Sequence, residues 1–292
     1  MSKTKRRWGD RKDGRWVRDL DSLHRLMPHV YVGRTNSEVY ISEEFDITEL
    51  LAYIKEQNEL HPEFKTTLFH AILTAMGKVI YSRPLLNRFI AGRRTYERND
   101  IVFSFMAKRQ FNDTSAESLM LLKIKPEATL NDISNRIVGN VKDVRAGKDA
   151  GADAIMDFLT KMPRPVLIIV STILRILDYY GKLPTSISSV DVNYSTAIVT
   201  NLGSIKCSSV YHHLSNWGTC SIIIAIGTIH KKPFYNEDGS VTLRDVVDIG
   251  MTIDERIGDG FYFAKSLKFL QHILSNPQLL DLPIEEEVEY EY

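Results

Sequence analysis

The sequence contains little cysteine and no long apolar run. Two cysteines, Cys207 and Cys220, in 292 residues do not form a disulfide framework of the secreted kind and fit a reducing, cytoplasmic compartment. The most apolar run, PVLIIVSTIL at 165–174, has ten residues, whereas a membrane span takes about twenty. The first residues, MSKTKRRWGDRK, lack the apolar core of a secretion signal. We therefore expect a soluble cytoplasmic protein with no membrane partner.

Several motifs that carry a known chemistry are also missing. There is no GxxxxGK[ST] phosphate loop, no GxGxxG segment after a strand and no GxSxG elbow. The eight histidines and two cysteines show no spacing typical of zinc ligands. His212 and His213 are adjacent, and adjacent residues of a regular element point to different faces, so we expect no metal site.

The equal numbers of positive and negative side chains exclude a strong net electrostatic field around the protein. The 37 Lys and Arg residues match the 37 Asp and Glu residues, so no nucleic-acid partner is expected. The ends are polarised, however: residues 1–18 hold eight basic residues against two Asp, and residues 285–292 read EEEVEYEY. Such runs are typical of solvated tails; alternatively, the basic arm docks on an acidic tail or on a phosphorylated ligand.

Hydrophobic periodicity predicts a mixture of strands and helices. Strands are expected at 37–47, 100–111, 118–126, 196–205, 220–229 and 245–253. Helices are expected within 46–60, 66–84, 129–148 and 261–277, and one or two more, broken by MPRP, within 151–183. The helix at 66–84 is apolar on most faces and should be buried. Strands and helices alternate without a strict βαβ order, which favours an α/β or α+β class with a mixed sheet.

Six segments resemble, in the same order, those of a known family. DERIGDGFYFAKSLKFL (254–270) is similar to the HxxxDG turn and following helix of the catalytic domain of 2-oxo acid dehydrogenase complex acyltransferases and of chloramphenicol acetyltransferase, with Glu255 in place of the histidine. VTNLGSI (199–205) and SIIIAIG (221–227) resemble the S/T-N-L-G segment and the strand after it. The remaining three similar segments are at 42–56, 66–87 and 128–148.

This resemblance implies a fold, an assembly and substrates. The fold would be a chloramphenicol acetyltransferase-like two-layer sandwich, a mixed β-sheet covered by helices. It would occupy residues 20–283, between a basic arm (1–19) and an acidic tail (284–292), with 149–194 a more divergent, apolar helical segment. The family forms homotrimers, which can assemble into cages, and its active site lies in a channel between two subunits. Coenzyme A, or its acyl thioester, and a small-molecule acyl acceptor would enter that channel from opposite sides.

The resemblance also assigns roles to individual residues. Glu255 stands at the position of the base, and Thr200 at the position of the hydroxyl that stabilises the oxyanion. Asp259 would hold the turn through a buried arginine, for which Arg25 is the first candidate and Arg34 the second. Further residues expected along the channel are Asn201, Gly203, His212, His213, Trp217 and Gly260.

The carboxylate at position 255 leaves two functional hypotheses open. A thiol has a pKa of about 8.5, imidazole about 6.5 and a free carboxylate about 4.3, so proton transfer to Glu255 is about two units harder than to histidine. That difference is roughly 3 kcal/mol, or about a hundredfold in rate, and burial of the carboxyl group would recover part of it. Either Glu255 is an atypical base, or it pairs with Arg256 or another cation and the protein is a non-catalytic trimer that binds a ligand or supports assembly.

Other residues also have two interpretations. His212 or His213 could supply a replacement base, although surface or structural histidines fit the same pattern. Trp217 is typical of a loop and could line a channel wall. Cys207 and Cys220 flank apolar strands and are expected to be buried structural thiols. The apolar helix at 165–180 is expected in the core or at a subunit interface, or as a lid over an acyl chain.

Overall fold

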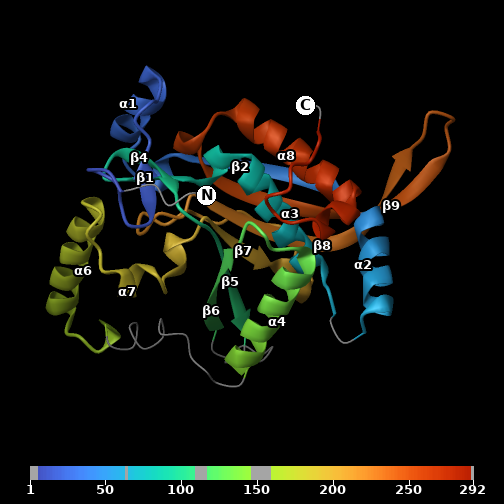
Figure 1. Cartoon of the computed structure of the whole chain (residues 1–292), viewed down its shortest axis with the longest axis horizontal. Helices are drawn as coiled ribbons and strands as arrows, with labels where there is room; N and C mark the ends of the chain where they lie inside the picture. The colour runs from blue at the N-terminus through green and yellow to red at the C-terminus, as the bar shows by residue number, and fades with distance from the viewer. Residues whose placement is uncertain (1–5, 63–64, 109–116, 146–158, 291–292) are drawn as a thin grey trace.

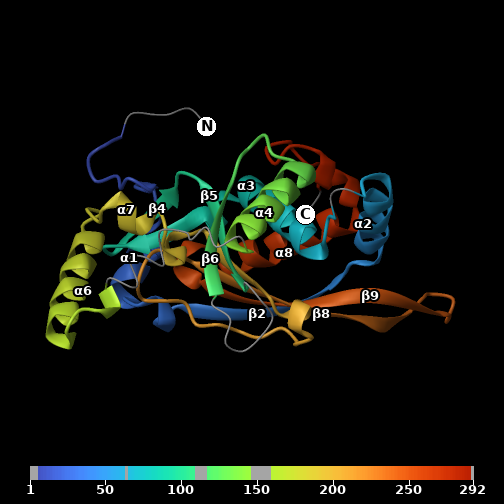
Figure 2. The ribbon, with the colours of Figure 1, turned by 90° about the horizontal axis from the view of Figure 1, so that it is seen from below.

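The structure, a computed structural model, describes residues 6–62, 65–108, 117–145 and 159–290. Its larger sheet has six strands, and Figures 1 and 2 show helices packed on one face of it. In spatial order the strands are β2 (Glu38–Asp46), β9 (Val241–Asp254), β8 (Ile222–Tyr235), β7 (Ala197–Asn201), β5 (Ile101–Lys108) and β6 (Glu117–Ile124). β7 runs parallel to both of its neighbours, and the other pairs are antiparallel. The predicted mixed sheet covered by helices is confirmed.

The covering helices bury their apolar faces against this sheet. They are α2 (Thr48–Leu60), α3 (Leu68–Ser82), α4 (Leu130–Arg145) and α8 (Gly260–Ser275). α3 begins at Thr67, whose hydroxyl caps the first turn, and every residue from His70 to Ile80 is buried, as the sequence predicted. On β9 the residues facing the helices alternate along the strand, which is the pattern of a sheet with one face in the core. These core residues of β9 are Val247, Ile249, Met251 and Ile253.

A second, smaller sheet lies at one end of the molecule and was not predicted. It consists of β1 (Gly14–Trp16), β4 (Arg94–Arg98) and β3 (Arg88–Ala91), and α1 (Ser22–Val30) packs beside β4. The β3–β4 turn places Gly92 and Arg93 at φ values of 54° and 57°. Such turns usually carry Asn-Gly or Asp-Gly, so the Gly-Arg pair gave little sequence signal.

The long β8–β9 hairpin also differs from the prediction. The strands expected at 220–229 and 245–253 continue through residues 230–244, and the hairpin extends from the body at the end opposite α6 (Arg164–Tyr179) (Figure 1). A register shift between Ile226 and Ile229 marks the point where the hairpin leaves the core. Beyond it the strands are mostly exposed, which removes the apolar alternation that identifies a strand in a sequence.

Four further expectations need correction. Cys207, which was expected to be buried, is exposed, whereas Cys220 is buried as expected. The strand predicted at 196–205 ends at Asn201, and a 3₁₀ turn follows. α6 is a helix as predicted, but none of its residues is buried, so it is not part of the core of this chain. The residues before it, 146–158, lie outside the described part of the chain. The acidic tail, as far as Tyr290, is anchored to the body although its glutamates are exposed: the N–H of Ile284 donates to the Ala128 carbonyl at 2.9 Å, and the Tyr290 ring lies 4.8 Å from that of His272.

The remaining elements are short. A single helical turn, α7, spans Thr185–Ser188. The 3₁₀ turns are Arg34–Asn36, Pro84–Asn87, Val192–Tyr194, Leu202–Ile205, Glu255–Ile257 and Pro277–Asp281. Within the described ranges, every helix is too short or too polar to cross a bilayer.

Candidate functional site

Glu255 begins the 3₁₀ turn that follows β9. Its backbone N–H donates to the carbonyl of Ser37 at 2.8 Å, which ties the turn to the start of β2. The residue is half-buried. Among the described residues, its carboxylate has no hydrogen-bond or ion-pair partner in the chain. The side chain at the predicted base position is therefore not committed to a structural contact.

Arg256 pairs with Asp254, not with Glu255. Its Nε lies 2.7 Å from Asp254 Oδ1 and its Nη2 lies 2.6 Å from Oδ2, and both side chains are almost fully buried. Nη1 donates to the carbonyl of Tyr31 at 2.6 Å, at the C-terminal end of α1. The interpretation of Glu255 as the partner of Arg256 is wrong, and the sequence reasoning missed the Asp254–Arg256 pair that fixes the turn.

Asp259 caps helix α8. Its Oδ1 accepts from the N–H of Tyr262 at 2.7 Å. The expected partner Arg25 instead donates to the carbonyls of Arg18 and Leu20, at 3.1 and 3.4 Å, and no ion pair joins it to Asp259 in the described chain. Arg34, the second candidate, is buried and donates to the carbonyl of Ile90 at 2.6 Å. Neither predicted arginine holds Asp259 within one chain.

The glycine after Asp259, Gly260, is exposed and is the first residue of α8. A Cβ built there would meet no atom within 4 Å, so a small residue is not required for packing inside the chain.

Thr200, Asn201 and Gly203 lie where β7 ends. Thr200 is half-buried and paired with Ala225 on β8. The Asn201 side chain accepts from the N–H of Ser204 at 3.3 Å and caps the 3₁₀ turn. At Gly203 a Cβ would lie 2.4 Å from the carbonyl oxygen of Gly227, so only glycine fits.

A cavity of about 370 Å³ opens beside this segment. Two of the predicted channel residues, Asn201 and Gly203, line it. The other lining residues are Thr67, Leu68, Phe69, Ser204, Lys206, Ile226, Gly227, Thr228 and Ile229. The cavity thus lies between the N-terminal end of α3 and the VTNLG segment.

The structure separates Glu255 from Thr200 within one chain. Thr200 pairs with Ala225, and Ala225 pairs with Gly250, five residues before Glu255 on β9. Five residues along a strand and two strand spacings across the sheet amount to roughly 19 Å. One chain alone does not bring the two predicted catalytic groups together.

His213 is oriented by a buried carboxylate. Its Nδ1 lies 2.9 Å from Oε2 of Glu38, whose side chain is 2% exposed, whereas that of His213 is 80% exposed. Burial raises the pKa of Glu38, but hydrogen bonds from the Tyr40 hydroxyl, the His213 ring and the Leu214 N–H outweigh it, and the pKa is lowered. Nδ1 is held by the carboxylate, and Nε2 of this exposed ring has no hydrogen-bond partner among the described residues.

The other two predicted channel residues of this loop, His212 and Trp217, differ in how they contact the rest of the chain. His212 is exposed. Trp217 Nε1 donates to Asp191 Oδ2 at 2.6 Å, and its ring packs on Tyr194 with centroids 6.2 Å apart, so it anchors the loop to the body.

The loop that carries His213 lies across the sheet face opposite the helices. A Cβ on Gly250 would lie 2.6 Å from the Val210 carbonyl oxygen, and one on Gly227 would lie 2.7 Å from the Ser209 nitrogen. Glycines on β9 and β8 therefore let the loop rest directly on the strands. The loop thus crosses β8 and β9, the two strands that lie between β7 and β2.

One group of side chains in the described chain has metal-ligand character. Glu44, His230 and Asp248 come from three adjacent strands, and one ligand atom of each lies within 4.8 Å of the others. Lys232 Nζ lies 2.5 Å from Glu44 Oε1, and the His230 ring nitrogens lie 3.6 Å from Glu44 and 3.9 Å from Asp248. These contacts form a partly exposed ion-pair network, which the sequence reasoning missed because its members are far apart in the chain.

The C-terminal third of the chain matches a known family. Residues 182–282 match the model described as the catalytic domain of 2-oxoacid dehydrogenases acyltransferase, a range that includes both Thr200 and Glu255. The lipoamide acyltransferase component of the branched-chain alpha-keto acid dehydrogenase complex of Bacillus subtilis (strain 168) is 22% identical over 241 residues, covering 80% of this chain and 45% of that protein. The chain thus spans about half the length of this curated relative.

Solved structures share the fold. The dihydrolipoamide acetyltransferase of Azotobacter vinelandii, studied for the roles of a serine, a histidine and an asparagine in its catalytic mechanism, has a TM-score of 0.61 and 15% identity, covering 90% of this chain and 93% of that one. The cubic core of a pyruvate dehydrogenase multienzyme complex has a TM-score of 0.53 and 15% identity, covering 90% and 93%. A chloramphenicol acetyltransferase has a TM-score of 0.50 and 12% identity, covering 89% and 99%. The resemblance predicted from the sequence is confirmed: residues 182–282 match the catalytic domain of 2-oxoacid dehydrogenases acyltransferase, and the chain shares the fold of such domains.

Proposed function

We propose that this protein is a coenzyme A-dependent acyltransferase, which moves an acyl group between a thioester and the thiol or hydroxyl of a small acceptor. The observation that carries the proposal is the match of residues 182–282 to an acyltransferase catalytic domain. The cavity beside Asn201 and Gly203 supports it, because acyl transfer needs an enclosed site in which two reactants meet.

The site is assembled between subunits of a homotrimer. Glu255 and Thr200 are roughly 19 Å apart in one chain, so Glu255 of one subunit would meet Thr200 of its neighbour. A fold shared with the cubic core of a pyruvate dehydrogenase complex supports an assembly of this kind, and trimers could assemble further into a cage.

In this site the Thr200 hydroxyl donates to the oxyanion of the tetrahedral intermediate, and Glu255 accepts the proton of the attacking thiol or hydroxyl. In the Azotobacter vinelandii enzyme the histidine and asparagine that were studied stand four residues apart. Glu255 and Asp259 have the same spacing here.

His213 is a second candidate for the base. An imidazole is intrinsically a stronger base than a carboxylate and is therefore a better proton acceptor for a thiol. The bond from Nδ1 to Glu38 fixes the ring in the way that a catalytic histidine is fixed by a carboxylate. Both candidates lie near the start of β2, because the N–H of Glu255 bonds to Ser37.

A thioester assay tests the proposal. Purified protein is incubated with acetyl-, propionyl- or longer acyl-coenzyme A and dihydrolipoamide or another thiol, and free coenzyme A is titrated. Thr200→Ala is expected to lower kcat by about 10²–10³, and Glu255→Gln by about 10²–10⁴, without loss of the trimer measured by light scattering.

The second candidate function is a trimer without catalysis, which binds a ligand or supports assembly. The carboxylate at position 255 favours it. No coenzyme A release with any donor, together with a trimer that survives in both variants, would establish this alternative.

A further inference from the structure

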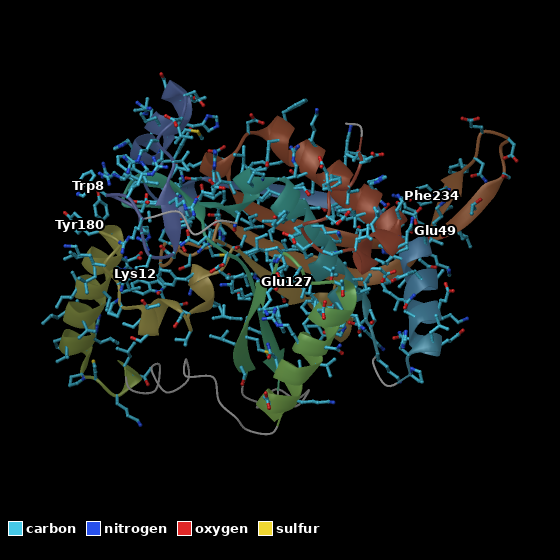
Figure 3. The ribbon with its side chains drawn as sticks, viewed as in Figure 1. Trp8, Lys12, Glu49, Glu127, Tyr180 and Phe234 are labelled. Carbon is cyan, nitrogen blue, oxygen red and sulfur yellow. The ribbon has the colours of Figure 1, made fainter. Side chains whose placement is uncertain are left out.

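The largest cavity that we describe lies away from the acyltransferase site. Its volume is about 630 Å³, which is in the range of small-molecule sites. It lies between the segment after β1, helix α1, the β3–β4 turn and the end of α6, and shares no lining residue with the cavity beside Gly203. Its lining residues are Trp16, Val17, Arg18, Leu20, Arg25, Pro28, His29, Gly92, Arg93, Arg94, Thr95 and Tyr179. Figure 3 labels Trp8 and Tyr180 at this end of the molecule and Phe234 at the other.

Four arginines make this cavity strongly cationic. None of Arg18, Arg25, Arg93 and Arg94 has a carboxylate within 4 Å in the described part of the chain. Arg18 acts electrostatically on Asp10, but the Asp10 carboxylate accepts the backbone N–H groups of Arg7 and Trp16. The positive charge of the four arginines is therefore offset only in part, by Asp10 near Arg18.

Two of the four guanidinium groups lie against one aromatic ring. Arg94 and Arg18 lie 4.2 and 4.7 Å from the centroid of the Trp16 ring, a cation–π arrangement that brings two like charges together. Arg18 Nη2 also donates to the Trp8 carbonyl at 2.6 Å, and Arg25 Nη2 to the Arg18 carbonyl at 3.1 Å. The remaining N–H groups of these forks are available to an anion.

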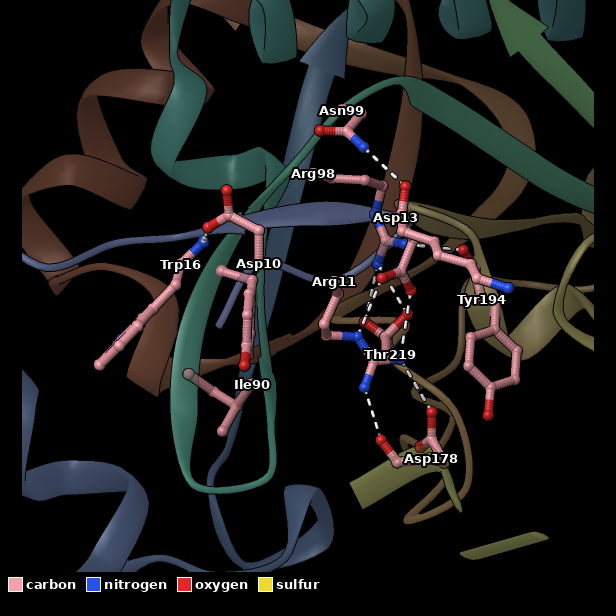
Figure 4. A network of polar contacts seen from close by, with 12 residues as sticks. Asp10, Arg11, Asp13, Trp16, Ile90, Arg98, Asn99, Asp178, Tyr194 and Thr219 are labelled. Atoms are coloured by element: carbon pink, nitrogen blue, oxygen red, sulfur yellow. Dashed lines mark hydrogen bonds and ion pairs between the residues drawn. The ribbon is translucent and has the colours of Figure 1, made fainter. Parts of the chain in front are cut away.

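The walls of the cavity are fixed by buried contacts. Arg11 lies 2.9 Å from both Asp13 Oδ1 and Asp178 Oδ1 and donates to the Asp178 carbonyl at 2.6 Å (Figure 4). Asp178 precedes Tyr179, so this network positions the wall formed by α6. The β3–β4 turn touches the same wall, because a Cβ on Gly92 would lie 2.3 Å from the Tyr179 carbonyl oxygen.

We propose that this cavity binds a nucleotide through its phosphate groups. Arginine forks bind phosphate in a bidentate way, and four of them suit a group with two or more phosphates. The apolar surfaces of Leu20, Pro28 and Tyr179 provide a place for the base and ribose. Coenzyme A and free nucleoside diphosphates share this chemistry, and the coenzyme A source alone depends on the proposed acyltransferase function.

Calorimetric titration of the whole chain with ADP, coenzyme A and inorganic phosphate tests the proposal. Binding of ADP or coenzyme A with one site per chain is expected, and it should weaken as salt rises. Arg18→Gln/Arg94→Gln should weaken it at least tenfold, and Arg93→Asn, which keeps a residue that tolerates positive φ, should weaken it to a smaller extent. Arg175→Gln on α6 removes an exposed arginine outside the cavity and should leave the affinity unchanged.

Each result is decisive for the cavity. Binding of ADP and coenzyme A with similar affinity identifies the shared nucleotide group as the ligand, and binding of coenzyme A alone identifies coenzyme A as the source. The proposal is overturned if neither ADP nor coenzyme A binds, or if they bind only at concentrations as high as those of a phosphate buffer. It is also overturned if Arg18→Gln/Arg94→Gln and Arg175→Gln have equal affinity for the nucleotide. Thermal unfolding of each variant confirms that it is folded.

Failure here and failure of the proposed acyltransferase are separable. If the wild-type protein binds ADP through these arginines but releases no coenzyme A from thioesters, the cavity stands and the acyltransferase proposal fails. If acyl transfer occurs and the arginine variants bind nucleotide as the wild type does, the acyltransferase proposal stands and the cavity proposal fails.

Discussion

Nδ1 of His213 lies 2.9 Å from Oε2 of Glu38, and this contact helps to join the loop that carries His213 to the first strand of the larger sheet. The carboxylate also accepts from Tyr40 and Leu214, so it is the common acceptor of the cluster. A buried carboxylate below an exposed imidazole has consequences for both stability and activity.

Glu38→Gln is expected to destabilise the protein at neutral pH. The pKa of Glu38 is lowered in the folded state, so its contribution is present above the ordinary carboxyl pKa of 4.5 and is lost as the pH falls below it. Urea midpoints of wild type and variant should therefore differ at pH 7 and converge near pH 3. A difference that is constant with pH would contradict this assignment.

His213→Gln separates the two candidate bases. If His213 removes the proton, kcat/KM of this variant falls and the shape of its pH profile changes. His212→Gln is the matched control, since His212 is exposed beside His213 and has no such carboxylate contact in the described chain. An unchanged profile in His213→Gln would leave Glu255 as the base.

Arg256→Met is expected to destabilise the chain by about 3–5 kcal/mol, because it leaves the buried carboxylate of Asp254 without its bidentate partner. Chemical denaturation measures the change, with Arg175→Gln as the exposed control. The double variant Asp254→Leu/Arg256→Met should recover a large part of the loss. Equal stability of the single and double variants would show that the ion pair is not the source of the effect.

His70 is expected to make the protein acid-sensitive. Burial lowers the pKa of His70 to about 4, below the ordinary 6.5, and its Nδ1 has no partner in the described chain. The unfolded chain binds the proton first, so stability is full above pH 6.5 and falls toward pH 4, by roughly 3 kcal/mol in total. Denaturation of wild type and His70→Leu at pH 4.5 and 7.5 measures this, and an equal pH dependence in both would contradict it.

Gly203→Ala should be costly and Gly260→Ala should not. A methyl group at 203 would lie 2.4 Å from the Gly227 carbonyl oxygen, whereas one at 260 meets nothing within 4 Å. We expect a loss of about 1–3 kcal/mol for the first and little change for the second, measured by thermal unfolding. Similar melting temperatures would contradict the packing at the end of β7.

The sequence predicted the elements with the strongest apolar periodicity. α3 was identified as a helix that is apolar on most faces, α8 because its apolar residues recur at helical spacing, and the core strands because they are β-branched runs. The small sheet was missed since β1 and β4 are short and rich in arginine, with no alternation to mark them. The exposed strand residues beyond Ile229 also lack this alternation, so the sequence did not predict that the hairpin continues past them.

The candidate site was predictable only where it is local in sequence. The 254–260 turn and the VTNLG segment were found because their residues are contiguous. The contacts that define their chemistry were not: Glu38 meets His213 across 175 positions, and Arg256 reaches Tyr31 across 225. Such partners depend on strand order, which a single sequence does not specify.

The hairpin formed by β8 and β9 has a firm base and an unsupported tip. From Ile249 to Ile253 the strand is covered by helices, whereas Tyr235 is 82% exposed and Leu243 60%. A two-stranded ribbon is marginal by itself in water. The two ends of one continuous hydrogen-bond ladder should therefore open at very different rates, so amide hydrogens near the tip will exchange with deuterium long before those at the base, and a neighbouring molecule that grips the tip would slow them selectively.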